Sequence, residues 1–140
     1  MEEEFVPYNL ALKLKELGFN ELCFAGFRDS EWFGTDGPNS RYFHAQLFKN
    51  SQFDKDQKDC CSSPTFSQVF RWFREKHRII TEIRFYNNGE DWEDTEFTVT
   101  VNRFEDFATH NTFVKNDIKS YEEAELICLE KLIEIVKDKF

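Results

Sequence analysis

Residues 120–136, SYEEAELICLEKLIEIV, carry the clearest secondary-structure signal in the chain. Ser120 and Glu123 form a Ser-x-x-Glu capping box, which predicts a helix over 121–137. At about 100° per residue, its apolar side chains cover an arc wider than the ~100° stripe of an ordinary surface helix. We expect this helix to be covered on more than one side, by a sheet and another helix or by a partner chain. The pattern therefore leaves a homodimer open.

Two stretches ahead of this helix alternate apolar and polar residues with a period of two. They cover 79–86 and 97–101 and predict antiparallel strands of a sheet with one wet face. The connection over 87–94 consists of turn-forming residues and acids. Residues 104–119 are the hardest to place, and we expect a short strand at 112–115 within them.

A second helix is expected to begin near Thr65, which forms a Thr-x-x-Gln capping box with Gln68. One face of this helix carries apolar residues at three- and four-residue spacing, namely Phe66, Val69, Phe70 and Phe73 together with His77. The opposite face carries Arg71, Arg74 and Arg78.

The first half of the chain begins with a helix expected over 7–17, with Pro7 near its start and Gly18 just past its last turn. A strand is predicted over 21–27 and another over 41–48.

The loop over 29–39 would join these two strands as a hairpin with a long connection. Residues 49–63 are polar and show no apolar period, so we expect an exposed loop.

Together these elements predict an α+β protein, in which helices pack on one side of an antiparallel sheet in the order α-β-β-α-β-β-(β)-α. The chain has 140 residues, of which 40% are hydrophobic, with 5 Gly and 3 Pro. This length and composition predict one folded domain over 1–140.

The chain is acidic, with 27 acidic and 18 basic residues and a net charge of -9. Phosphate groups repel such a surface, so non-specific nucleic-acid binding by the whole surface is disfavoured, whereas a local basic patch stays open. The acidic start, Met1 to Glu4, lacks the basic and apolar regions of an export signal, and no apolar run approaches the roughly 20 residues that span a bilayer. We expect a cytoplasmic protein without membrane contact.

The four cysteines are expected to be free thiols in a reducing compartment. Cys23 and Cys128 lie among apolar residues and are interpreted as core residues. The adjacent pair Cys60 and Cys61 lies in the polar stretch, where a redox or metal role, or a nucleophilic thiol, is the alternative to a structural one.

The sequence shows no motif for metal binding or catalysis. His44, His77 and His110 lie on different expected elements, and the acidic clusters at 54–59 and 90–96 lack the pattern of an EF-hand loop. A nucleophile elbow, a Walker loop and a dinucleotide-binding glycine pattern are all missing. We therefore expect no metal, no cofactor and no enzyme activity.

The candidate binding residues are Arg71, Trp72, Arg74 and Arg78, the one basic concentration in the chain. The arginines would form a row of guanidinium groups that grips phosphates or an acidic protein surface, with Trp72 as an outward-facing stacking platform. In the alternative interpretation, these arginines neutralise the protein's own carboxylates.

Residues 64–137 resemble the double-stranded-RNA-binding domain in their layout of helix, three strands and helix. Residues 120–125, SYEEAE, line up with the Ser-Lys-Lys-x-Ala-Lys start of that family's second helix. Tyr121, Glu122 and Glu125 replace the three lysines that grip phosphate in that family. The resemblance therefore implies a shared topology and no shared activity.

The chain also resembles short uncharacterised proteins of phages and prophages of gut anaerobic bacteria. The resemblance is carried by residues 64–76, PTFSQVFRWFREK, by 121–125, YEEAE, and by 128–134, CLEKLIE. It also covers 14–19 and leaves 28–63 unmatched. It implies a mobile-element setting, in which small acidic proteins often bind a host protein.

These observations predict a small soluble non-enzymatic binding protein, such as a phage accessory protein acting on a host protein. The expected contact surface is the face of Arg71, Trp72, Arg74 and Arg78, or the exposed aromatic residues of 27–48. The alternative is a nucleic-acid-related module, which either binds RNA or DNA through the arginine face or imitates nucleic acid with its acidic surface.

Overall fold

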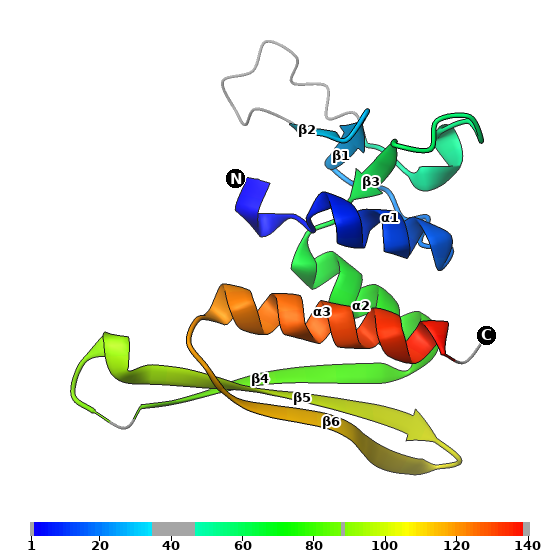
Figure 1. Ribbon diagram of the computed structural model, residues 1–140. Coiled ribbons are helices and arrows are strands. Elements are labelled where there is room, and N and C mark those ends of the chain that lie inside the picture. Colours follow the sequence, from blue (N-terminus) through cyan, green and yellow to red (C-terminus); the bar gives the residue numbers. More distant parts are fainter. Residues whose placement is uncertain (1, 35–46, 88, 139–140) are drawn as a thin grey trace. The chain divides into compact units, whose positions relative to one another are not determined.

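The computed structural model describes residues 2–34, 47–87 and 89–138 (Figure 1). The chain divides into two compact units, Met1–Val69 and Phe70–Phe140, and the boundary falls inside helix α2. A single domain over 1–140 stays a prediction, because a division by contacts does not show which parts unfold together.

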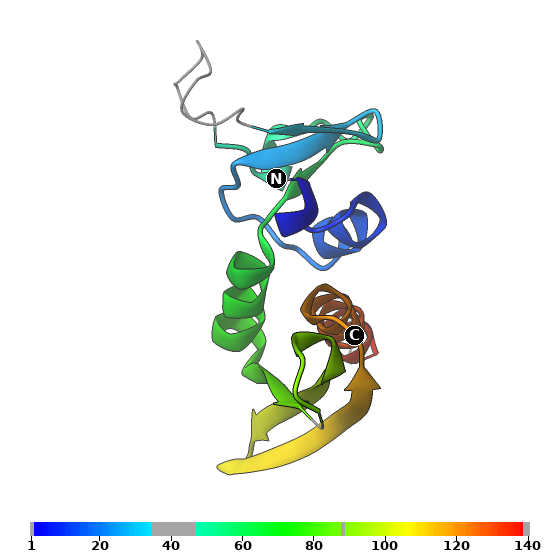
Figure 2. The same cartoon turned by 90° about the vertical axis from the view of Figure 1, so that its left-hand side faces the viewer.

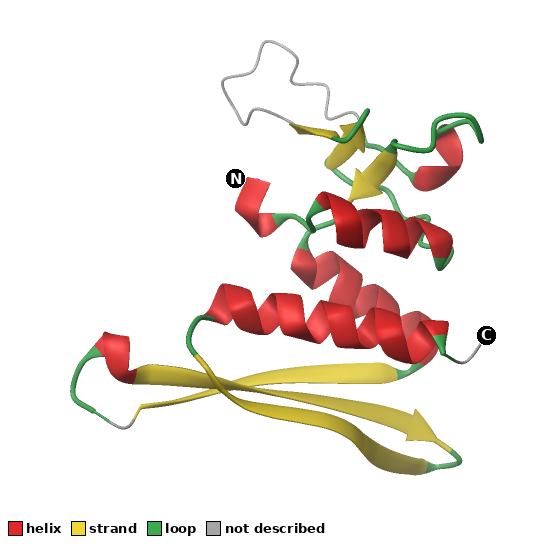
Figure 3. Cartoon of the chain, viewed as in Figure 1, coloured by secondary structure: helices red, strands yellow, loops and turns green. Residues whose placement is uncertain are grey.

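The described residues form an α+β protein, as the sequence predicts (Figure 3). The strands lie in two antiparallel sheets, ordered β2-β1-β3 and β4-β5-β6, so the elements follow the order αβββαβββα. Their bounds are α1 (Tyr8–Glu16), β1 (Ala25–Arg28), β2 (Glu31–Gly34), β3 (Cys61–Ser63), α2 (Phe66–His77), β4 (Ile79–Asn87), β5 (Thr95–Glu105), β6 (Ala108–Ile118) and α3 (Tyr121–Lys137).

Helix α1 ends at the glycine that the sequence indicates. Gly18 has a left-handed backbone with φ +93°. Its amide donates to the Lys15 carbonyl at 3.1 Å, and the Phe19 amide donates to the Leu14 carbonyl at 3.0 Å. These two bonds form a Schellman cap, and the buried Phe19 ring supplies its apolar contact.

The hairpin of the first sheet differs from the prediction. β1 turns back onto β2 through Asp29 and Ser30, whose φ values of 53° and 65° match a type I′ turn. The predicted hairpin with 41–48 is not formed by β1, which pairs with β2 and β3. Residues 41–46 lie outside the described part of the chain, and Phe48 forms an isolated antiparallel bridge with Cys23.

The prediction of an exposed loop over 49–63 is wrong for its last residues, which form strand β3. Residues 54–59 are exposed as expected, but Cys60 and β3 are buried, and β3 pairs with β1. The buried Asn50 amide donates to the Phe19 carbonyl at 2.7 Å, and its oxygen accepts from the Ser62 amide at 2.9 Å. Polar residues can be buried here because these hydrogen bonds replace those to water.

Helix α2 forms one half of its expected capping box. The Gln68 amide donates to the Thr65 hydroxyl at 3.2 Å. The Gln68 side chain, in contrast, donates to the Leu22 carbonyl at 2.7 Å and so fastens the helix to the segment before β1. Both residues lie within the first unit.

The second sheet confirms the strands predicted from the period-two pattern. β4 pairs with β5 from Ile79↔Arg103 to Asn87↔Thr95. β6 is longer than the strand expected at 112–115, because β5 reverses through the two-residue turn of Asp106 and Phe107, whose φ values are 52° and 61°.

Helix α3 packs on one face of this sheet and contacts all three strands (Figure 2). Its bounds agree with the predicted 121–137. The sheet contributes buried Ile79, Val99 and Val101, and the helix contributes buried Ala124, Cys128, Leu129, Leu132, Ile133 and Val136. The sheet therefore accounts for one side of the wide apolar arc.

Replacing the N-cap of α3 should destabilise the protein. The Ser120 hydroxyl accepts from the Glu123 amide at 3.1 Å, so Ser120→Ala leaves a helix amide without this partner. We expect a loss of about 1 kcal/mol in the free energy of unfolding, measured by urea denaturation. Ser120→Asp keeps an acceptor and should retain most of the stability. Equal stability of the alanine variant and the wild type would contradict this.

Candidate binding surfaces

The predicted arginine row is only partly present. Arg71 and Arg74 are exposed on α2, but α2 ends at His77, and Arg78 follows it with φ 58°. The Arg78 carbonyl accepts from the Phe104 amide at 3.0 Å, which joins this residue to β5. The prediction of three arginines on one helix is therefore wrong for Arg78. Among the described residues, no carboxylate forms an ion pair with any of the three.

The Trp72 side chain is buried, with 7% of its surface exposed. Its ring packs edge-on against Phe73 at 5.0 Å and against His77 at 4.9 Å between centroids. The prediction of an outward-facing indole is wrong, because Trp72 follows Val69 by three residues and therefore falls on the buried face of the helix. The arginines lack the expected stacking platform, and their role in binding stays a prediction.

The cysteines are free and buried, including the adjacent pair Cys60 and Cys61. Burial raises the pKa of the Cys61 thiol to about 12 and that of Cys23 to about 11. The Lys15 ammonium group lies close by, but it donates to the Cys60 carbonyl at 2.7 Å. Thiols with raised pKa values and no access to solvent are poor nucleophiles.

Cysteine labelling tests this environment directly. At pH 7 in the native protein, we expect iodoacetamide to leave Cys61 unmodified, because the thiolate is scarce and buried. Mass spectrometry after labelling in native buffer and in urea measures the difference. Selective alkylation of Cys60 or Cys61 in native buffer would revive the hypothesis of a nucleophilic thiol.

The structure does not bring together a set of metal ligands. In the described part of the chain, no three His, Cys, Asp or Glu side chains are placed to share an ion. His77 lies against Trp72 and Phe73, His110 is exposed on β6, and His44 lies outside the described residues.

A cavity of about 400 Å³ lies in the first unit, at the β1–β2 hairpin. Its walls combine aromatic rings with charged side chains, from Arg28, Asp29, Glu31, Trp32, Phe33 and Phe48. The Phe33 ring packs edge-on against Phe48 at 4.7 Å, and the Arg28 guanidinium lies 5.6 Å from the Phe33 centroid. The volume falls within the range of ligand-binding clefts, but three of the six lining residues are charged, whereas such clefts are mostly apolar.

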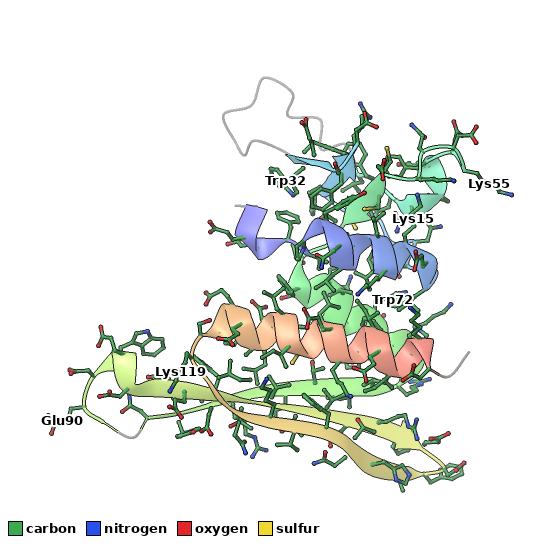
Figure 4. The ribbon with its side chains drawn as sticks, viewed as in Figure 1. Lys15, Trp32, Lys55, Trp72, Glu90 and Lys119 are labelled. Carbon is green, nitrogen blue, oxygen red and sulfur yellow. The ribbon has the colours of Figure 1, made fainter. Side chains whose placement is uncertain are left out.

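Trp32, labelled on β2 in Figure 4, lines this cavity. Its Nε1 atom is buried and has no hydrogen-bond partner among the described residues. The charged side chains of the lining, Arg28, Asp29 and Glu31, are exposed and so are the polar groups that a ligand can reach.

Two glycines leave space for the aromatic walls. A Cβ atom on Gly26 would lie 2.8 Å from the Phe33 Cζ and 2.8 Å from the Cys61 carbonyl oxygen. A Cβ atom on Gly34 would lie 2.4 Å from the end of the Trp32 ring. The absence of side chains at these positions therefore lets both rings approach the backbone of the sheet closely.

Exposed apolar side chains lie on segments that lead to the cavity. The Cys23↔Phe48 bridge places Phe24 and Leu47 at adjacent positions on two antiparallel segments. Phe24 is 50% exposed and Leu47 is 37% exposed, and Leu22 is 47% exposed. The prediction of exposed aromatic residues over 27–48 is wrong for Phe27, which is 4% exposed, and Trp32, Phe33 and Phe48 are half-buried. Tyr42 and Phe43 lie outside the described residues.

Adding a methyl group at Gly26 should damage this region. Gly26→Ala forces the new Cβ against a backbone oxygen that cannot move without shifting β3, so we expect a loss of about 1–3 kcal/mol in unfolding free energy. Gly34→Ala meets only the movable end of a side chain and should cost less while changing tryptophan emission. Urea denaturation compares the two variants. A Gly26→Ala protein as stable as the wild type would refute the close approach.

No helix within the described residues is long and apolar enough to cross a membrane. No protein-family model matches the chain, and neither a curated protein nor a solved structure shows significant similarity to it. The resemblances to phage proteins and to the double-stranded-RNA-binding domain therefore stay predictions, although residues 66–137 do follow the order helix, three antiparallel strands, helix.

Proposed function

We propose that the protein is a non-enzymatic binding protein that acts through protein contacts, and that its partner docks at the cavity of the β1–β2 hairpin. One observation carries the proposal: Trp32, Phe33 and Phe48 line a cavity of about 400 Å³ at the β1–β2 hairpin, beside the exposed side chains of Arg28, Asp29 and Glu31. Concave aromatic walls with a polar rim are typical of protein interfaces, where an anchor residue enters a pocket.

The lining of the cavity favours a partner residue that has an apolar side chain and an oxygen acceptor next to it. The rings of Phe33 and Phe48 would enclose the apolar group, and the exposed Arg28 guanidinium would donate to a backbone carbonyl of the partner. The resemblance to phage and prophage proteins supports a host protein as the partner.

Affinity capture with cavity variants tests the proposal. Phe33→Ala and Phe48→Ala each enlarge the cavity and remove an aromatic wall. If a host protein is captured by the wild type, we expect each variant to lower its affinity by about tenfold or more, as interface anchors do. The affinities are measured by calorimetry on the purified pair.

Phe107→Gly is the matched control, because it removes a side chain that is 97% exposed from the other unit. Failure to capture any specific partner, or equal losses in the control and the cavity variants, would contradict the proposal. Nucleic-acid binding that weakens steeply with salt and is lost in Arg71→Glu/Arg74→Glu would favour the alternative function, because these arginines are exposed.

A further inference from the structure

The sheet of the second unit extends beyond the helix that covers it, and an aromatic face is left open there. Phe85 in β4 is paired with Phe97 in β5, so their rings lie on the same face. Tyr121, in the first turn of α3, packs edge-on against Phe97 at 5.8 Å, and Phe97 is 7% exposed. Phe85 is 71% exposed. Figure 1 shows β4 and β5 extending past the start of α3.

Further aromatic surface lies at the same end of the sheet. Trp92, in the turn (Trp92–Asp94) immediately before β5, is 75% exposed, and Tyr121 is 48% exposed. An ordinary protein surface exposes apolar residues singly, whereas this end of the unit exposes three large aromatic side chains.

Two segments at this end of the sheet are rich in carboxylates. The β4–β5 connection and the first turns of α3 contribute them, namely Glu90, Asp91, Glu93, Asp94, Glu122, Glu123 and Glu125. We call these residues, together with Phe85, Trp92 and Tyr121, the acidic aromatic end. None of its carboxylates forms an ion pair with a described residue.

The local structure holds this charge in place without neutralising it. The Asn87 side-chain amide donates to the Asp91 carbonyl at 2.7 Å and to the Thr95 hydroxyl at 3.0 Å, so the acidic connection is fixed to the strands. The nearby Lys119 is paired with Glu96 (Figure 4). Burial and the charge of Glu122 raise the pKa of Glu125, so a neighbouring cation would relieve an unfavourable negative charge.

We infer that the acidic aromatic end is a docking surface for a lysine- and arginine-rich segment of another protein. Charge complementarity selects this occupant, because seven carboxylates surround rings that can stack with guanidinium groups. Nucleic acid is disfavoured, since its phosphates would meet the same carboxylates. The inference concerns the second unit and does not depend on the cavity of the first.

Peptide titration of the full-length chain tests the inference. The probe is a synthetic arginine- and lysine-rich peptide with interspersed leucines, and the measurements are calorimetry and the emission of Trp92. We expect binding that Phe85→Ser/Trp92→Ser weakens by about tenfold or more. Both side chains are more than two-thirds exposed, so their removal should leave the fold intact, which circular dichroism checks.

Two matched controls separate a specific surface from general attraction to an acidic protein. Glu90→Gln/Asp91→Asn/Glu93→Gln/Asp94→Asn should weaken binding strongly. Glu75→Gln/Glu105→Gln/Asp106→Asn/Glu130→Gln removes the same number of exposed carboxylates elsewhere in the unit and should have little effect. Phe107→Gly, at the far end of β5, should also bind like the wild type.

Three results would overturn the inference: equal weakening by the two sets of charge variants, no effect of the Phe85/Trp92 variant, or light scattering that shows the surface occupied by a second copy of the chain. Absence of peptide binding by the wild type, with partner capture by the hairpin cavity intact, would overturn this inference and leave the proposed function standing. Peptide binding without capture of any partner would overturn the proposed function and leave this inference standing.

Discussion

The packing of α3 on β4, β5 and β6 is the interaction on which the second unit depends. The helix buries Leu129 and Leu132, the sheet buries Val99 and Val101, and each element covers the apolar face of the other. Burial of such side chains contributes roughly 1.5–3 kcal/mol each, which makes this contact the main source of stability for the unit. The helix begins at Tyr121, whereas β4 and β5 extend beyond it, so the same packing that stabilises the sheet also leaves Phe85 exposed.

The stability of the first unit depends more on buried polar groups than that of the second unit does. Asn50 is buried and links the end of α1 to β3, and the Ser63 hydroxyl donates to the Val6 carbonyl at 2.8 Å. Hydrogen bonds of this kind add little net stability, but an unpaired buried partner is costly, so they specify one arrangement of the segments. Gly26 and Gly34 then allow aromatic rings to approach the sheet closely, which shapes the cavity.

The β1–β2 and β5–β6 hairpins each reverse through two residues other than glycine that have a left-handed backbone. Asp29 and Ser30 form one turn, and Asp106 and Phe107 form the other. A left-handed conformation is strained for a bulky side chain, and Phe107 keeps it while its ring is 97% exposed. Without a glycine at these positions, the usual signature of a two-residue turn is missing from the sequence, which explains why β2 and the full length of β6 were not predicted.

Elements with local signals could be predicted from the sequence. They are the caps at Gly18, Thr65 and Ser120, the three helices, and the alternating strands β4 and β5. Capping and periodicity involve neighbours within a few residues, so no knowledge of the fold is needed to recognise them. Whether the candidate site residues and the polar strand β3 are buried or exposed depends on tertiary contacts. Trp72 is buried because its face of α2 is covered. The Ser63 hydroxyl is buried with the Val6 carbonyl as its acceptor, and the backbone amide of Ser62 is buried with the Asn50 side chain as its acceptor, so both partners come from distant parts of the chain.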